Sequence, residues 1–278
     1  MGSMTASDIN DGVDIVRRHG ILSPEPCARL AHLLDLEAPT DVVPVGWHIL
    51  YLLNNPTTAE LGEDGHVACG VPGGGALGRM FAGGRITTYR PLVFGQSAQR
   101  QIRTLPPVHK QGRTGALTFV TVEHSIIQDG QVAVTEHQNL VYRDLSSVGS
   151  RGELTAPPVR SVAEDEPRCV LDVDEVMLFR FSALTYNAHR IHFDRDWCRR
   201  SGYPDLVVHG PLMALLGSEL ARRQGIDLIG REYTYRVGAS AFGAQRITAV
   251  PAVEGLDSGV EVLAADGTRT VTGHFSAP

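Results

Sequence analysis

The chain of 278 residues contains little cysteine, almost no lysine and no long apolar run. Its 4 cysteines show neither a Cys-x-x-Cys pair nor the spacing of a metal finger, which argues against a disulfide framework and a structural zinc site. No apolar stretch approaches the roughly 20 residues that a membrane-spanning helix needs. Lysine occurs once, at Lys110, so arginine supplies the other 24 of the 25 basic side chains. We therefore expect guanidinium groups to meet the anionic parts of a ligand.

The charge balance is mildly acidic. The formal net charge is −6, the sequence pI is about 6.0 and no dense basic block occurs, so we expect neither nucleic acid nor a membrane as a partner. Apolar residues make up 42% and charged residues 20%, as in globular proteins. Residues 1–3 have the character of an expression remnant, and no charged segment followed by an apolar one precedes the rest. We expect reduced thiols and a cytoplasmic location.

Two short segments recur in the same order along the chain. Residues 84–90 and 230–236 share five of seven positions, and Asp-Gly at 129–130 and at 266–267 is each time followed by Val-Thr-x-His. The offsets are 146 and 137 residues, so the two copies differ slightly in length. This pattern predicts two modules, residues 1–155 and 156–278. The histidines repeated in the two copies are expected to be structural.

Each module is predicted to combine a helix with a run of strands. Residues 211–223 have leucines on one helical face, with proline in the first turn and Gly225 as a stop. Strand-like runs follow near 233–237, 245–250, 260–264 and 270–275, and the first copy has similar runs at 117–127 and 131–142. The glycine-rich residues 73–81 occupy the helix position of the first copy, where we expect a short or distorted helix. The predicted fold class is α+β, with an antiparallel sheet wrapped around a long helix.

One segment concentrates polar and titratable side chains. Residues 187–194 contain one asparagine, two histidines, one arginine and one aspartate. His209 and Gly210 follow shortly after, at the start of the predicted helix. Backbone N–H groups at a helix start lack partners, so they suit a developing oxyanion. Without a Cβ atom, Gly210 also lets a carbonyl group approach closely.

This segment resembles the signature of the MaoC-like hydratase and dehydratase family, which reads Asp-x-Asn-Pro-x-His-x-Asp followed by His-Gly at a helix start. Members carry a double hot-dog fold and add water to, or remove it from, acyl thioesters. The variant Tyr-Asn-Ala-His-Arg-Ile-His-Phe-Asp is more similar to the branch with mesaconyl-CoA and itaconyl-CoA hydratases and the type 2 hydroxyacyl-thioester dehydratases. Residues 46–48 and 80–85 are similar to that branch as well, and the resemblance spans most of residues 40–278.

The resemblance implies three catalytic residues. Asn187 falls at the position of the family's catalytic aspartate, His192 at that of its histidine and Gly210 at that of its oxyanion-hole glycine. An amide cannot accept a proton, so we expect Asn187 to orient water or substrate, and His192 to act as general base and acid. No metal or redox cofactor is implied, since coenzyme A is part of the substrate.

Four neighbouring side chains are candidates for substrate binding: Tyr186, His189, Arg190 and His209. Packing beneath the site would explain His189 as well, an ion pair would explain Arg190, and capping or loop packing would explain His209. Asp194 is expected to fix a helix start or to orient a neighbour.

A metal site is the less favoured interpretation of the same segment. His189, His192, Asp194 and His209 have a permissive spacing. No carboxylate stands where the base for a zinc-bound water is expected, so we predict no metal.

The first copy is predicted to have lost the catalytic pair. The shorter offset places Leu50 opposite Asn187 and Asn55 opposite His192, and residues 72–73 stand where His209 and Gly210 stand in the second copy. We therefore expect one active site per chain, in the C-terminal module, with the N-terminal module forming a wall of the acyl or coenzyme pocket.

The predicted function is reversible addition of water to an α,β-unsaturated acyl thioester, which gives a 3-hydroxyacyl thioester. Coenzyme A is the favoured carrier, and an acyl carrier protein is the alternative. The closest branch favours short, branched or dicarboxylic groups such as mesaconyl or itaconyl, and the resemblance implies a (3R) product. A thioesterase and a non-catalytic acyl-CoA binding module remain as other classes. Because hot-dog proteins usually pair their sheets, we expect a homodimer.

Overall fold

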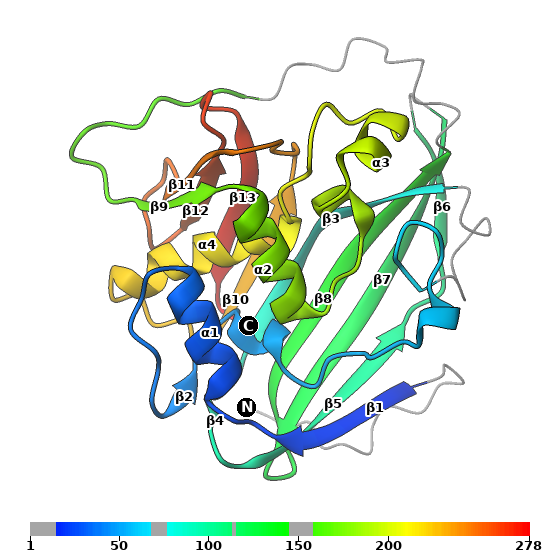
Figure 1. Ribbon diagram of the computed structural model, residues 1–278. Coiled ribbons are helices and arrows are strands. Elements are labelled where there is room, and N and C mark those ends of the chain that lie inside the picture. The colour runs from blue at the N-terminus through cyan, green and yellow to red at the C-terminus, as the bar shows by residue number, and fades with distance from the viewer. Residues whose placement is uncertain (1–14, 68–76, 113–114, 145–157) are drawn as a thin grey trace.

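The computed structural model describes residues 15–67, 77–112, 115–144 and 158–278. One antiparallel sheet of 11 strands dominates it, in the order β1-β5-β7-β8-β3-β10-β13-β12-β11-β9, with β6 paired to β7 (Figure 1). Its strands in the N-terminal half are β1 (Ile15–Ile21), β3 (Leu77–Thr88), β5 (Ser97–Thr104), β6 (Val108–Gly112), β7 (Gly115–Gln128) and β8 (Gln131–Asp144). Those in the C-terminal half are β9 (Cys169–Val173), β10 (Arg231–Val237), β11 (Gln245–Pro251), β12 (Gly259–Leu263) and β13 (Arg269–Ser276). A separate pair joins β2 (Val42–Val43) to β4 (Leu92–Val93).

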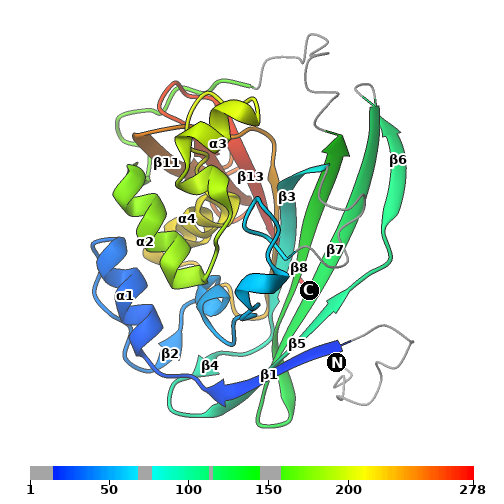
Figure 2. The ribbon, with the colours of Figure 1, turned by 45° about the vertical axis from the view of Figure 1, so that its right-hand side comes forward.

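The helices lie on one face of the large sheet (Figure 2). They are α1 (Glu25–Leu33), α2 (Glu175–Thr185), α3 (Arg195–Arg200) and α4 (Gly210–Arg223), with 3₁₀ turns η1 (Trp47–Leu50), η2 (Thr58–Glu60) and η4 (Arg190–His192). None of the helices in the described part of the chain is both long and apolar enough to cross a membrane.

The order of the strands repeats about the centre of the sheet. Outward from the β3–β10 pair, β8, β7, β5 and β1 follow on one side and β13, β12, β11 and β9 on the other. The two copies of the repeated segment form this central pair, in which Arg231 lies opposite Thr88 and Tyr235 opposite Gly84. Each Asp-Gly turn joins equivalent strands, β7 to β8 and β12 to β13. The repeat found in the sequence therefore corresponds to a repeat of strand order.

Helix α4 begins and ends as the sequence predicted, with proline in its first turn. Its residues from Leu212 to Ala221 are all buried, and it packs against β11, β12 and β3. The strands predicted in both halves are confirmed to within two residues at each end. Apolar side chains of α4 and of the inner sheet face make up much of the main core.

The helix expected near residues 73–81 is wrong where the structure describes it. Residues 77–81 belong to β3, which pairs with β8 along its length and with β10 at its C-terminal end. Glycine is a poor helix former, and pairing with β8 satisfies the backbone of residues 77–81 better than a short isolated helix. Residues 73–76, the Pro-Gly pair at 72–73 and the predicted boundary at 155 lie outside the described residues. The helix that the N-terminal half does contain, α1, was not predicted.

A glycine in the middle of α4 gives a test of this packing. A Cβ atom on Gly217 would lie 2.6 Å from the hydroxyl oxygen of Tyr233 and 2.8 Å from a methyl of Val260. Alanine favours an isolated helix by about 1 kcal/mol over glycine, yet we expect Gly217→Ala to lower the free energy of unfolding by about 1–3 kcal/mol through overpacking. Urea denaturation measures this change.

Gly238→Ala is the matched control, because a Cβ atom there meets nothing within 4 Å. Its free energy of unfolding should stay within about 0.5 kcal/mol of the wild type. A stabilised Gly217→Ala protein would contradict the close packing of α4 on the sheet.

Candidate active site

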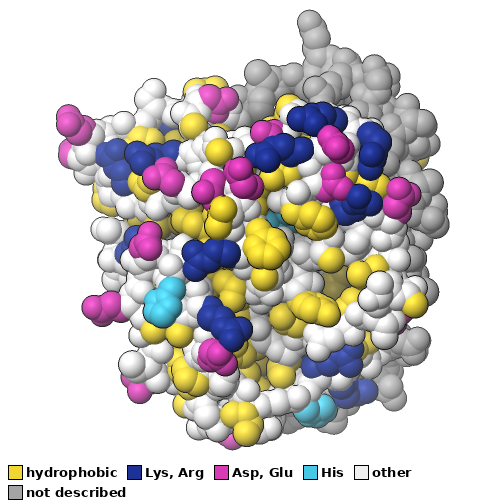
Figure 3. Space-filling model, viewed as in Figure 1, with side chains coloured by type: hydrophobic (Ala, Val, Ile, Leu, Met, Phe, Trp, Pro, Cys, Tyr) yellow, Lys and Arg dark blue, Asp and Glu magenta, His cyan; other side chains and the backbone are white. Residues whose placement is uncertain are grey.

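A cavity of about 730 Å³ lies between the helices and the N-terminal half of the sheet. Residues of β3, β5, β7 and β8 form one wall, and residues of α2, η4 and the start of α4 form the other. Hydrophobic side chains gather around a recess on the face seen in Figure 3, and the exposed aromatic residues Phe179, Tyr186 and Phe193 all line the cavity. Both halves of the chain therefore contribute to one pocket.

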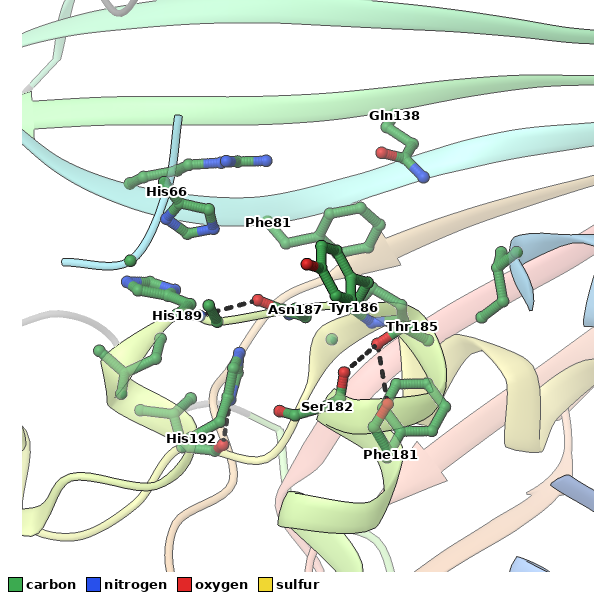
Figure 4. A pocket seen from close by; sticks show the side chains of 18 of the residues that line it. His66, Phe81, Gln138, Phe181, Ser182, Thr185, Tyr186, Asn187, His189 and His192 are labelled. Atoms are coloured by element: carbon green, nitrogen blue, oxygen red, sulfur yellow. Dashed lines mark hydrogen bonds between the residues drawn. The ribbon is translucent and has the colours of Figure 1, made fainter. Parts of the chain in front are cut away.

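His192 ends the short turn η4 and lines this cavity (Figure 4). Its Nδ1 atom lies 2.7 Å from the carbonyl oxygen of Val207. Because a carbonyl only accepts hydrogen bonds, Nδ1 carries the proton and Nε2 carries a lone pair. Burial lowers the pKa of His192 to about 4, so the imidazole is neutral at pH 7. His192 is therefore a fixed, unprotonated base.

His209 lies behind His192 and not in the cavity lining. The two rings stack with their centroids 3.6 Å apart, and His209 Nε2 lies 2.8 Å from the Ser182 hydroxyl. The side chain is 0% exposed, and burial keeps its pKa well below the ordinary value. The sequence left open whether His209 contacts substrate or serves in capping or loop packing. Its position in the structure corresponds to loop packing. His209 supports the ring of His192 from behind.

Asn187 follows the C-terminus of α2, where Tyr186 adopts a left-handed conformation with φ of 52°. Its Oδ1 atom accepts a hydrogen bond from the His189 backbone N–H at 3.0 Å. With Oδ1 held in this way, the amide NH₂ is the end that Asn187 can offer to a ligand in the cavity. This group donates hydrogen bonds and cannot take a proton.

Gly210 is the first residue of α4 and lines the cavity. In a helix start its N–H has no intrahelical acceptor, and Pro211 beside it has no N–H at all. A Cβ atom at Gly210 would lie 2.7 Å from the ring of Phe81, so only glycine fits against that side chain. The positive end of the helix dipole and one N–H group thus face the pocket.

His189 meets two residues of the N-terminal half that the sequence analysis missed, Asp64 and His66. The rings of His66 and His189 have centroids 4.0 Å apart, and His66 Nδ1 lies 3.3 Å from Asp64 Oδ2. The hydrogen bond from His66 holds the pKa of Asp64 below its ordinary value, whereas burial lowers the pKa of both histidines. In the sequence, the only sign of these two residues was the triplet Asp64-Gly65-His66 itself.

Backbone contacts hold this triplet against the segment at 187–194. The Asp64 carbonyl oxygen accepts a hydrogen bond of 2.9 Å from the Arg190 backbone N–H. Gly65 has φ of 86°, and a Cβ atom there would lie 1.9 Å from the Ala188 carbonyl oxygen. Only glycine allows the two segments to approach this closely.

The structure also changes which residues can hold a metal ion. Ligand atoms of Asp64, His66 and His189 lie within 4.8 Å of one another. Asp194, a member of the set considered from sequence, instead caps α3 by accepting a hydrogen bond from the Trp197 N–H, as a helix-start role predicts. Two imidazoles and a carboxylate suit a first-row transition metal or zinc.

Arg190 lies at the edge of the site, outside the cavity lining. Its guanidinium donates to Asp194 Oδ2 at 2.6 Å and 3.0 Å and lies over the Trp197 ring. The ion pair is thus the role in which the structure places Arg190. Tyr186 is 59% exposed and lines the cavity opening, where a substrate can contact it.

Comparison with known sequences points to one family. The profile described as hydroxyacyl-thioester dehydratase type 2 matches residues 46–242. The chain is also 44% identical over 193 residues to a protein of Chloroflexus aurantiacus named mesaconyl-C(4)-CoA hydratase, an alignment that covers 66% of this chain and 67% of the relative.

Solved structures show the same fold. HtdX of Mycobacterium tuberculosis matches with a TM-score of 0.68 at 17% identity, covering 95% of this chain and 100% of that chain. A MaoC-like dehydratase of Phytophthora capsici matches with a TM-score of 0.64 at 12% identity, covering 96% of each chain. A further M. tuberculosis protein, described as a double hot-dog fold, matches with a TM-score of 0.55 at 12% identity over 99% and 98% of the two chains.

The fold implied by the sequence motif is therefore confirmed as a double hot-dog. The matched family region contains the cavity side chains Asn187, His192 and Gly210 as well as the Asp-Gly-His triplet. The chain belongs to the hydroxyacyl-thioester dehydratase type 2 family and is a hydro-lyase.

Proposed function

We propose that this enzyme reversibly hydrates an α,β-unsaturated acyl-CoA to a 3-hydroxyacyl-CoA, with His192 as the base and acid. The main support for this proposal is the hydrogen bond from His192 Nδ1 to the Val207 carbonyl oxygen. It leaves Nε2 as an unprotonated acceptor in the cavity wall. The N-terminus of α4 lines the same cavity, so a base and an anion-stabilising N–H are available to one substrate.

In the hydration direction His192 Nε2 takes a proton from water as the water oxygen bonds to Cβ. The electron pair of the C=C bond moves toward the thioester, and negative charge develops on the carbonyl oxygen. The Gly210 N–H stabilises that charge. Protonated His192 then gives its proton to Cα, which restores the carbonyl group and the neutral imidazole. Dehydration runs through the same steps in reverse.

Asn187 positions the attacking water in this scheme. Its carbonyl oxygen is already engaged by the His189 N–H, so its NH₂ group donates to the water oxygen and leaves a water proton for His192. A positioned acid or base contributes about 10²–10⁴-fold, and one oxyanion donor about 10²–10³-fold.

The proposed substrate is inferred from the relative in Chloroflexus aurantiacus. The substrate in the name of that relative, mesaconyl-C(4)-CoA, supports coenzyme A as the carrier and a short branched or dicarboxylic enoyl group as the acyl part. An acyl-carrier-protein thioester is the alternative substrate, and a (3R) product is part of the proposal. A second class, the thioesterase, is separated from hydration by release of free thiol.

His192→Ala tests the base. We expect the loss of enoyl absorbance with crotonyl-, mesaconyl- and itaconyl-CoA to slow by about 10²–10⁴-fold, with no thiol released by the wild type. His32→Ala, on the exposed face of α1, is the matched histidine control and should keep full activity. Wild-type thiol release would move the function to thioester hydrolysis, and an active His192→Ala enzyme would remove the proposed base.

The buried histidines set the expected pH dependence. Because His192 acts when Nε2 is unprotonated and its pKa is about 4, kcat/KM should stay level down to about pH 5 and fall near pH 4. A limb centred near pH 6.5, the value of an exposed imidazole, would contradict this environment for His192.

The free energy of unfolding should also depend on pH, and it should fall as the pH is lowered. Histidine titrates near pH 6.5 in the unfolded chain, above the value of about 4 in the folded state. Between these values the unfolded state binds more protons, so stability is fully present above about pH 6.5 and falls as the pH drops toward 4. Urea midpoints measured across this range separate unfolding from loss of the base.

The cluster of Asp64, His66 and His189 makes metal dependence testable. The scheme needs no metal, so we expect full activity after dialysis against a strong chelator and substoichiometric metal by elemental analysis. Loss of activity that Zn²⁺ or Mn²⁺ restores would instead assign a catalytic metal to this cluster.

A further inference from the structure

The described lining of the cavity carries cationic side chains but no anionic ones. It includes Arg79 and Arg100 and no aspartate or glutamate. The chain as a whole has the opposite balance, with 31 acidic and 25 basic side chains. A pocket with low-dielectric walls and charges of one sign attracts a ligand of the other sign. The cavity is therefore suited to a ligand that places negative charge inside it.

Arg100 is occupied by the protein. Its Nη1 donates to the Tyr51 carbonyl oxygen at 2.9 Å, and its Nε and Nη2 lie 3.3 Å and 3.1 Å from His124 Nδ1. The side chain is 5% exposed and joins β5 to β7 and to the segment that contains η1. These bonds explain Arg100 as part of the cavity wall.

Arg79 has no such partners within the described part of the chain, where no hydrogen bond or ion pair engages its guanidinium. Asp64, the nearby carboxylate whose charge reaches it, is hydrogen-bonded to His66 instead. Burial lowers the pKa of Arg79, although guanidinium stays charged at neutral pH. A partly buried cation that no carboxylate contacts directly carries an electrostatic cost, and a bound anion would offset that cost.

Arg79 lines the same cavity as His192 and Gly210. Arg79 and Phe81 project from the same face of β3, about 7 Å apart along the strand, because alternate residues share a face. Phe81 in turn packs against Gly210, the proposed oxyanion donor. Burial lowers the pKa of His66 and His189, which line the same cavity, and the charge of Arg79 adds to this lowering.

We propose that Arg79 binds a second carboxylate on the acyl group and so sets the enzyme's selectivity for the dicarboxylic acyl groups that the proposed function includes. The proposal rests on the hydration function above and names the feature that selects its substrate. A guanidinium fork matches a carboxylate through two parallel hydrogen bonds. The phosphates of coenzyme A share this anionic chemistry, but they lie at the far end of the pantetheine arm from the reacting carbons.

Binding of two saturated thioesters tests the proposal without catalysis. Succinyl-CoA and butyryl-CoA differ in a terminal carboxylate in place of a methyl group, and neither can be hydrated. We expect Arg79→Gln to weaken succinyl-CoA about 10- to 100-fold in calorimetric titrations and butyryl-CoA less than about threefold, with Arg79→Lys between wild type and Arg79→Gln. Equal weakening of both ligands would assign Arg79 to the coenzyme, and no weakening would remove it from binding; either result overturns the proposal.

Arg85→Gln is the matched control. It removes one guanidinium from the same strand, yet Arg85 is 49% exposed, contacts His137 and Glu232, and does not line the cavity. Both affinities should be unchanged. A loss of succinyl-CoA binding in Arg85→Gln as large as in Arg79→Gln would show a general charge effect and overturn a specific contact.

Turnover separates this proposal from the proposed function. Mesaconyl-CoA with its carboxylate on Cβ and 3-methylcrotonyl-CoA with a methyl group there form the corresponding pair of substrates. We expect Arg79→Gln to lower kcat/KM for the first about 10- to 100-fold and for the second less than about threefold. Hydration of both at equal rates by the wild type would leave the hydratase standing and overturn the role of Arg79. Hydration of neither, with succinyl-CoA binding still dependent on Arg79, would remove the hydratase and leave carboxylate binding in place.

Discussion

The antiparallel pairing of β3 with β10 is the contact on which the rest of the structure depends. It joins two half-sheets with the same strand order into one continuous sheet, so that both halves face a common cavity. Two adjacent glycines permit it: a Cβ atom on Gly83 would lie 2.3 Å from the Tyr235 carbonyl oxygen, and one on Gly84 would lie 2.8 Å from the Tyr235 hydroxyl oxygen. The close approach also brings the Tyr235 hydroxyl within 3.5 Å of the buried Glu136 carboxylate.

The two halves use equivalent sheet faces differently. In the C-terminal half α4 covers the inner face and fills the core. In the described part of the N-terminal half no helix of that length covers β3, β5, β7 and β8, and side chains of these strands line the cavity instead. The inner face of the N-terminal half-sheet, which no such helix covers in the described residues, thus provides the space for a ligand. Helix α4 directs its N-terminus into that space.

Burial explains how the site holds several imidazoles without mutual repulsion. His66, His189, His192 and His209 are all kept neutral because desolvation disfavours the charged form, and for His66 and His189 it outweighs the opposing effect of Asp64. Neutral rings can stack, as His192 does on His209. A single hydrogen bond from Nδ1 to a backbone carbonyl then decides which nitrogen of His192 is the base.

The sequence by itself determined the duplication, the fold class, helix α4 and the segment that carries Asn187 and His192. Local patterns were sufficient for these, because leucine periodicity, Asp-Gly turns and a short motif act over neighbouring residues. It did not reveal Asp64, His66 or Arg79 as residues at the cavity, since each takes its place there only when the N-terminal half folds against the segment at 187–194. The same limit produced the wrong helix near residues 77–81, where pairing with β8 overrides local propensity. Which side chains share a pocket is a long-range property that only the tertiary structure decided, because it depends on contacts between residues more than 100 positions apart in the chain.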